Sequence, residues 1–276
     1  MSDDALREET LATPDGEARV VRQGAHVVHW RPRDAEAALF LSPRTARIPG
    51  RAIRGGVPIV FPWFGPRADD PAAPAHGFAR ILPWRVVAAA DGARALVLAS
   101  DAATRAAWPH DFALRYEVAL QPRALSLTLE VSNPSTAPFA FEAALHTYLR
   151  VGDARAARLT GLEGHAYLDK TDGDRISRLG DAPLILDGEV DRVFPGARGS
   201  CVVHDPVLGR RLVVDKTGSA TTVVWNPGPA RAAALADLGP DAWRDMVCVE
   251  TANTGDDRVT LAPGARHRMS ATLRCE

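Results

Sequence analysis

Two ionisable residues interrupt apolar, strand-like stretches of this sequence and could together move protons. His146 lies within AALHTYLRV, and Glu250 follows the apolar run 246–249 in MVCVETAN. An unpaired carboxylate is costly to bury, so Glu250 needs a partner or a role, and burial can raise its pKa toward neutrality. A histidine and a carboxylate are the minimal acid–base pair at neutral pH. Taken alone, however, a histidine in an apolar strand is more often a hydrogen-bonded core residue.

Two arginines lie in segments that could bind an oxyanion or sugar hydroxyls. Arg54 opens RGGVPIVFPWFGPR, where two glycines free the backbone and three prolines stiffen an aromatic loop. Arg80 closes HGFAR, which begins at His76. The plainer interpretations are a surface arginine beside packed aromatic residues, and a turn with a capping histidine and an exposed arginine.

Composition narrows the classes of function. Among 276 residues, 33 basic side chains face 34 acidic ones, and the net charge of −1 offers no field to gather nucleic acid or an anionic membrane. Three widely spaced cysteines form no C-x-x-C pair, so we expect neither a zinc site nor disulfides, and a reducing compartment fits. The first residues are polar and acidic, and no apolar run approaches the roughly 18 residues of a membrane span. We therefore expect a cytoplasmic protein.

The elements that must position these residues are β-strands. Polar and apolar residues alternate over 112–120, 124–132 and 267–274, which predicts half-buried strands. Turn signals at 91–92, 121–122 and 208–209 predict antiparallel hairpins, and one short helix is expected near 230–239. Without a repeat or a long linker, we expect one domain over 1–276, with its core at about 17–275. Many short antiparallel strands favour an all-β sandwich. Trp63 and Trp225 could line a cleft, but tryptophans in such a protein are more often core residues.

Taken together, these segments resemble the glucose-6-phosphate 1-epimerase family, within the aldose 1-epimerase or galactose mutarotase-like superfamily. RGGVPIVFPWFG followed by HGFAR is quite specific to this branch. The other matching segments are GAHVVHW (24–30), ALHTYL (144–149), VDRVF (190–194), VVWNP (223–227), MVCVE (246–250) and LAPG (261–264). The chain departs from the family at Ala75, Phe194 and Gly228, where glutamine, tyrosine and tryptophan are usual.

The resemblance implies a fold and a site. The expected fold is a galactose mutarotase-like β-supersandwich of mainly antiparallel strands with a cleft on its concave face. His146 is expected to be the general acid and Glu250 the general base. The resemblance also implies that Arg54, Arg80 and Asp191 bind substrate, and we add His76 to that set. From its position alone, Asp191 could equally be a turn residue.

The implied reaction interconverts the α and β anomers of a hexose 6-phosphate. One acid and one base on opposite sides of the acetal would open and reclose the ring, so no cofactor and no metal site are expected. The expected partner is a small-molecule sugar phosphate, without nucleic acid or membrane, and the protein is expected to be a monomer. Two alternatives stay open: a mutarotase of an unphosphorylated aldose, and a non-catalytic carbohydrate-binding protein.

Overall fold

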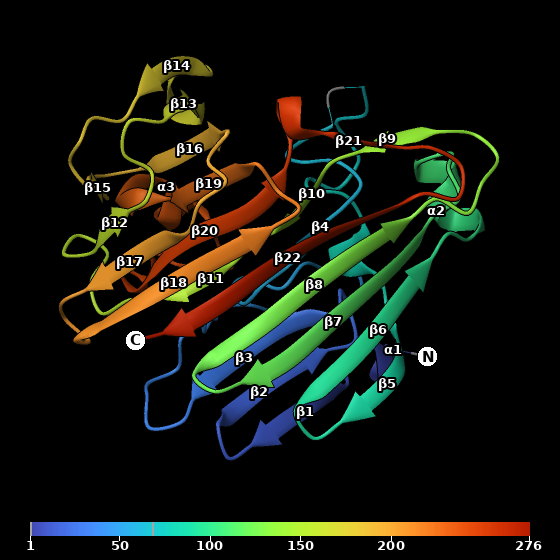
Figure 1. Ribbon diagram of the computed structural model, residues 1–276, viewed down its shortest axis with the longest axis horizontal. Helices are drawn as coiled ribbons and strands as arrows, with labels where there is room; N and C mark the ends of the chain where they lie inside the picture. The colour runs from blue at the N-terminus through green and yellow to red at the C-terminus, as the bar shows by residue number, and fades with distance from the viewer. Residues whose placement is uncertain (1, 68) are drawn as a thin grey trace.

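A nine-stranded antiparallel sheet forms the front layer of the molecule (Figure 1). The computed structural model describes residues 2–67 and 69–276. The strands of the front sheet are, in spatial order, β15 (Leu184–Ile185), β12 (Arg158–Thr160), β17 (Cys201–Asp205), β18 (Arg210–Thr217), β22 (Arg266–Cys275), β8 (Ala124–Ser132), β7 (Ala113–Gln121), β6 (Ala93–Ala99) and β5 (Arg85–Ala90).

The front sheet follows the alternation in the sequence. β8 spans the residues whose alternation predicted it, and its alternate side chains from Leu125 to Val131 are buried while the intervening ones are partly exposed. The predicted turns at 91–92, 121–122 and 208–209 connect β5 to β6, β7 to β8 and β17 to β18, each as an antiparallel pair. The sheet therefore buries one apolar face, which a second layer must cover.

An eight-stranded sheet provides most of that second layer. Its strands are, in spatial order, β14 (Arg175–Arg178), β13 (Ala166–Asp169), β16 (Val190–Pro195), β19 (Thr221–Asn226), β20 (Met246–Asn253), β10 (Ala143–Leu145) and β4 (Ile59–Val60), and β11 (Tyr148–Arg150) also pairs with β20. Every residue of β20 is buried. Val247 and Val249 join the core between the sheets, whereas Met246 and Cys248 join a second cluster on the opposite face, so both faces of this sheet are covered.

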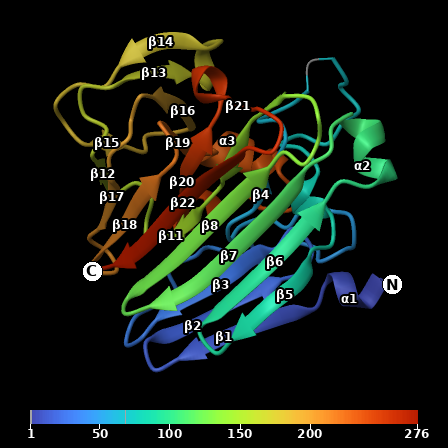
Figure 2. The same ribbon diagram turned by 45° about the vertical axis from the view of Figure 1, so that its right-hand side comes forward.

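Smaller elements complete the sandwich. A three-stranded sheet, seen behind the lower part of the front sheet in Figure 2, packs against β6 and β7, and β9 pairs with β21. Their strands are β1 (Glu8–Thr13), β2 (Gly16–Val21), β3 (His26–Pro32), β9 (Phe139–Phe141) and β21 (Val259–Leu261). The helices are α1 (Ser2–Ala5), α2 (Ala102–Ala107), α3 (Gly228–Ala234) and the 3₁₀ turns η1 (Ala79–Ile81), η2 (Lys170–Asp172), η3 (Ala242–Asp245) and η4 (Gly255–Asp257). No helix in the described part of the chain is long and apolar enough to cross a membrane.

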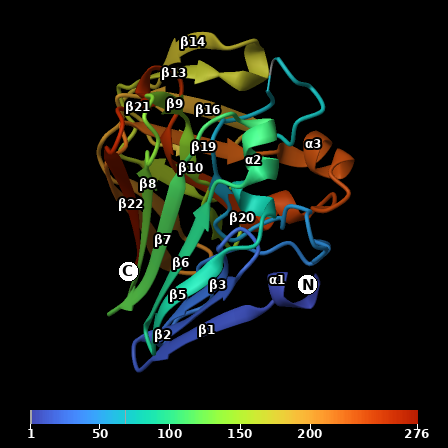
Figure 3. The same ribbon diagram turned by 90° about the vertical axis from the view of Figure 1, so that its right-hand side faces the viewer.

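The helix expected near 230–239 begins earlier and is shorter. Seen edge-on in Figure 3, α3 lies on the side of β19 and β20 that faces away from the front sheet. The side chain of buried Asn226 fixes its start, because Oδ1 accepts a hydrogen bond from the Gly228 N–H at 2.9 Å. Its Nδ2 donates to the Trp243 and Met246 carbonyls. The helix ends at Ala234, and residues 236–238 form a turn.

Candidate active site

The register of the strands places His146 directly opposite Glu250. Leu145 pairs with Thr251 in β10 and β20, and Tyr148 pairs with Cys248 in β11 and β20. His146 lies in the short break between β10 and β11, so the same register brings it across from Glu250. Facing residues of adjacent strands have Cβ atoms about 5 Å apart, so their side chains meet. A slip of one residue would send either side chain to the other face of the sheet.

The two side chains are in direct contact. His146 Nε2 lies 3.2 Å from Glu250 Oε1, and the two side chains are only 8% and 1% exposed. We expected the two groups on opposite sides of a bound acetal, and in the structure they lie within hydrogen-bonding distance of each other. The ring oxygen and the anomeric hydroxyl of a sugar are bonded to the same carbon, so two neighbouring side chains can reach both oxygens.

A cavity of about 230 Å³ opens over this contact, and all six of the residues selected from the sequence line it. Glu250, His146 and Asp191 belong to the eight-stranded sheet or to the break in it, and they form the floor. Arg54, His76 and Arg80 come from loops and from η1, and they form a wall. The remaining lining residues are Phe64, Ala75, Tyr148, Val223, Trp225, Arg231 and Leu235.

Burial favours the neutral forms of both members of the pair. It raises the pKa of Glu250 well above its usual value, helped by the nearby negative charge of Asp191 and opposed by Arg80. It also lowers the pKa of His146, and the neighbouring His76, Arg80 and Arg54 lower it further. The pair has two forms with the same total number of protons: a carboxylic acid beside a neutral imidazole, and a carboxylate beside an imidazolium. A proton shift across the contact interconverts the two forms.

The wall concentrates positive charge. Arg54 donates from Nε to Asp237 Oδ2 at 3.1 Å and from Nη1 to the Tyr148 hydroxyl at 3.2 Å. Arg80 donates from Nη2 to the Ala75 carbonyl at 2.7 Å, and its buried Nε is without a hydrogen-bond partner among the described residues. Burial lowers the pKa of Arg80, and the charge of Arg54 adds to this effect. Two guanidinium groups that line one cavity favour an anionic ligand there.

His76 is held in one tautomer. Its backbone lies in the left-handed region, with φ of 63°, and two hydrogen bonds to Gly65 keep it there. The His76 N–H donates to the Gly65 carbonyl at 2.7 Å, and the Gly65 N–H donates to His76 Nδ1 at 3.2 Å. Burial first, then Arg80 and Arg54, lower the pKa of His76 to about 3. The ring is therefore neutral with its proton on Nε2, where it can donate a hydrogen bond.

Sequence reasoning missed several residues of the site. Tyr148 stacks on His146, with ring centroids 4.8 Å apart and planes 11° from parallel. Trp225 belongs to the second cluster but also lines the cavity, beside Asp191 and Cys248 in the same cross-strand row. Tyr148 follows His146 by two positions, so strand alternation could have found it. Asp237 comes from the turn after α3, and nothing in its local sequence points to Arg54.

The three departures from the family pattern have different surroundings. Ala75 lines the cavity, where a longer polar side chain would reach substrate. Phe194 is fully buried against Tyr167, with ring centroids 5.2 Å apart, so it affects core packing. Gly228 has φ of +60°, and a Cβ there would lie 2.6 Å from the Glu189 nitrogen. A tryptophan at position 228 would therefore require a different backbone path into α3.

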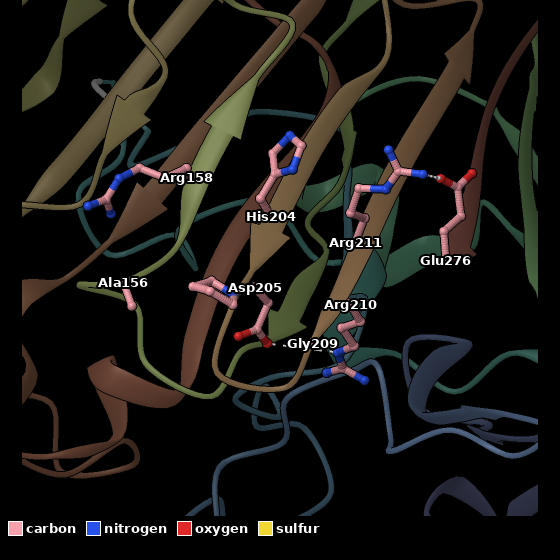
Figure 4. A pocket seen from close by; sticks show the side chains of 9 residues that line it. Ala156, Arg158, His204, Asp205, Gly209, Arg210, Arg211 and Glu276 are labelled. Atoms are coloured by element: carbon pink, nitrogen blue, oxygen red, sulfur yellow. Dashed lines mark ion pairs between the residues drawn. The ribbon is translucent and has the colours of Figure 1, made fainter.

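A larger hollow of about 430 Å³ lies elsewhere, over β12, β17 and β18 (Figure 4). Most of its polar groups already have partners. Arg211 pairs with Glu276 at 2.9 Å, and His204 Nε2 bonds to Thr160 Oγ1 at 3.0 Å. Arg210 donates to three backbone carbonyls, although its Nε is buried without a hydrogen-bond partner among the described residues. The buried acid of this hollow, Asp205, accepts hydrogen bonds from backbone N–H groups, so the smaller cavity is the better candidate for acid–base chemistry.

An antiparallel supersandwich with an acid–base contact on the outer face of one sheet defines a class, the β-sandwich carbohydrate epimerases. The sequence profile of the aldose 1-epimerase family matches residues 9–274, and the chain belongs to this family. It is accordingly an isomerase.

Relatives and solved structures agree with this assignment. Proteins described as "Putative glucose-6-phosphate 1-epimerase" from Salmonella typhimurium and Escherichia coli are 37% and 38% identical, over 86% and 87% of this chain and 80% of each relative. A crystal structure of a "putative mutarotase" from Salmonella typhimurium superposes with a TM-score of 0.88 at 34% identity, covering 96% of this chain and 89% of the other. A galactose mutarotase-like protein from Lactobacillus casei has a TM-score of 0.80 at 18% identity, covering 98% of this chain and all of the other, which supports the fold alone.

Proposed function

We propose that the protein is a glucose-6-phosphate 1-epimerase, which interconverts the α and β anomers of hexose 6-phosphates. The observation that carries the proposal is the 3.2 Å contact between His146 and Glu250, beneath a wall that holds Arg54 and Arg80. The names of the relatives support the same substrate. We propose a cytoplasmic protein that acts as a monomer; the three buried cysteines are free thiols, which suits a reducing compartment.

In the proposed mechanism, Glu250 removes the proton from the anomeric hydroxyl while His146 protonates the ring oxygen. The bond between C1 and the ring oxygen breaks, and the sugar opens to the free aldehyde. Rotation about the C1–C2 bond presents the other face of the carbonyl. Reclosure reverses both proton transfers, so the pair returns to its starting state, and the reaction needs neither a redox partner nor a nucleotide.

The phosphoryl group is proposed to lie between Arg54 and Arg80, with Asp191 and His76 bonded to ring hydroxyls. A phosphate dianion would offset the two guanidinium charges, which lower the pKa of His146 in the empty site. Binding would therefore raise the pKa of His146, the proposed proton donor. Because Arg80 also lowers the pKa of Glu250, the same offset would raise the pKa of Glu250, the proposed base.

Anomer-exchange NMR on glucose 6-phosphate and glucose tests the proposal. We expect the protein to accelerate exchange of the phosphorylated sugar above the spontaneous rate, with a lower KM than for glucose. Faster exchange of glucose alone would favour a mutarotase of unphosphorylated aldoses. Binding of glucose 6-phosphate with no change in the exchange rate would favour a carbohydrate-binding protein.

The proposed role of Asp191 predicts a pH dependence. Burial, opposed by Lys170 and Arg231, raises the pKa of Asp191 to about 6. The group is an ionised acceptor above that pH and protonated below it, so we expect the KM for glucose 6-phosphate to rise about 3- to 10-fold as pH falls from 7 to 5. Steady-state exchange rates across this range provide the measurement.

The phosphate of the substrate also titrates near pH 6, so the control is Asp191→Asn. This variant should have a higher KM at pH 7 and a shallower pH dependence, and the difference between the two proteins isolates Asp191. Parallel pH profiles in the two proteins would show that Asp191 does not bind the sugar.

A further inference from the structure

Tyr148 has a place in the site that the acid–base roles do not explain. Its ring is buried, and it lies face to face with the imidazole of His146. Trp225 meets the tyrosine ring edge-on, with centroids 6.0 Å apart, and also meets the imidazole edge-on at 6.1 Å. These two aromatic rings confine the imidazole, whose plane decides where Nε2 points.

The tyrosine hydroxyl is a donor whose acceptor must come from outside the protein. It accepts a hydrogen bond from Arg54 Nη1 at 3.2 Å, and a guanidinium has no acceptor to offer in return. In the described part of the chain, no other group is bonded to this hydroxyl. Burial raises the pKa of Tyr148, with opposing contributions from Arg54 and Arg80, so the phenol keeps its proton at neutral pH.

Arg54 cannot turn away to release this arrangement. Its Nε is bonded to Asp237, whose carbonyl in turn accepts a hydrogen bond from the Ser42 hydroxyl at 2.6 Å. The side chain is therefore held at Nε and Nη1, and Nη2 has no protein partner among the described residues. Tyr148, Arg54 and Arg80 all line the same cavity. A tetrahedral oxyanion can accept from all three side chains at once.

We propose that Tyr148 determines specificity and positions the acid: its hydroxyl, oriented by Arg54, donates a hydrogen bond to the phosphoryl group of the substrate, and its ring holds the imidazole of His146. The inference rests on the proposed function. It makes one side chain the link between the phosphate site and the acid–base pair.

The hydroxyl is tested by Tyr148→Phe, which removes one oxygen and keeps the ring. Removal of a hydrogen bond to a charged group weakens binding by about 10- to 100-fold. We expect the KM for glucose 6-phosphate and the inhibition constant of inorganic phosphate to rise together by that factor, whereas kcat falls less than about threefold. An unchanged inhibition constant would overturn the role of the hydroxyl, as would a loss confined to kcat.

Tyr148→Leu tests the ring. Because the imidazole loses its stacking partner, we expect kcat to fall at least about tenfold, in addition to the rise in KM. The matched control is Tyr116→Phe, which removes a buried core hydroxyl that has no hydrogen-bond partner among the described residues and lies away from the cavity. Thermal unfolding of each variant separates these effects from loss of folded protein. Equal kcat values for the Leu and Phe variants would overturn the role of the ring.

Calorimetric titration with inorganic phosphate separates this inference from the proposed function. A wild-type protein that binds phosphate but does not accelerate anomer exchange would contradict the proposed function and leave the hydroxyl testable by the affinity of Tyr148→Phe. Weaker phosphate binding by that variant supports the inference. Equal affinity, or a wild-type protein that does not bind phosphate, overturns it.

Discussion

The Glu250→Gln variant is expected to exchange the anomers of glucose 6-phosphate between about 10² and 10⁴ times more slowly than the wild-type protein. A positioned general base contributes a factor of this size, and an amide cannot take the proton of the anomeric hydroxyl. His146→Asn should lose activity to a similar degree. Because the two groups share one proton and act as a unit, the double variant should be about as slow as either single variant. Saturation kinetics by NMR measure all three.

Stability provides the control for this loss. Burial raises the pKa of Glu250 from its ordinary value of 4.5. Above that pH the carboxyl ionises in the unfolded chain but is held protonated in the folded protein, which lowers the free energy of unfolding; well below that pH the effect vanishes. Glu250→Gln removes the effect, and the variant should unfold at the same or a higher temperature at pH 7, with the gain shrinking toward pH 4.5. A stable Glu250→Gln protein with normal exchange would remove this residue from the mechanism.

Replacing Arg80 by Met is expected to lower kcat/KM for glucose 6-phosphate by about 10²- to 10⁴-fold. The guanidinium can make two charge-assisted hydrogen bonds to phosphate, and each is worth roughly 1.5–3 kcal/mol. Its Nε is already buried without a partner, so methionine removes no hydrogen bond of that atom while it keeps the length of the stem. Arg54→Met should lose a similar factor. Inhibition by inorganic phosphate should weaken in parallel, and added salt should weaken it further in the wild type.

The matched control is Arg211→Met in the larger hollow (Figure 4), where the guanidinium pairs with Glu276. That variant should keep the wild-type KM and the wild-type inhibition by phosphate. If Arg80→Met bound phosphate as tightly as the control, the substrate would be recognised elsewhere, and a mutarotase of unphosphorylated aldoses would become the better description.

Sequence reasoning could select His146 and Glu250 because both residues break a local pattern, and the family resemblance supplied their proposed roles. His146 and Glu250 are polar positions in apolar strands, and the cost of burying them indicates a shared site. Their contact could not be predicted, because it depends on the register between strands about 100 positions apart. Local alternation says which residues share a face, and it says nothing about which strands are neighbours.

The positions of the loop residues also could not be predicted from local sequence patterns. Arg54 and Arg80 could be selected from their rigid, aromatic surroundings, but their approach to one cavity depends on how the loops fold back over β20. Asp237 could not be selected at all, because its role depends entirely on the position of Arg54. The shorter α3 has a similar cause: the Asn226 side chain, not helix propensity, sets where the helix begins.

The separation between the strands that carry His146 and Glu250 and the loops that carry Arg54, His76 and Arg80 has an evolutionary consequence. Loops tolerate insertions, deletions and exchange far better than a paired β-ladder does. Descendants of this scaffold could therefore acquire new sugars by remodelling residues 54–80, while inheriting the ring-opening step unaltered. Laboratory evolution aimed at a different carbohydrate should begin in that segment and leave β10, β20 and the break that holds His146 untouched.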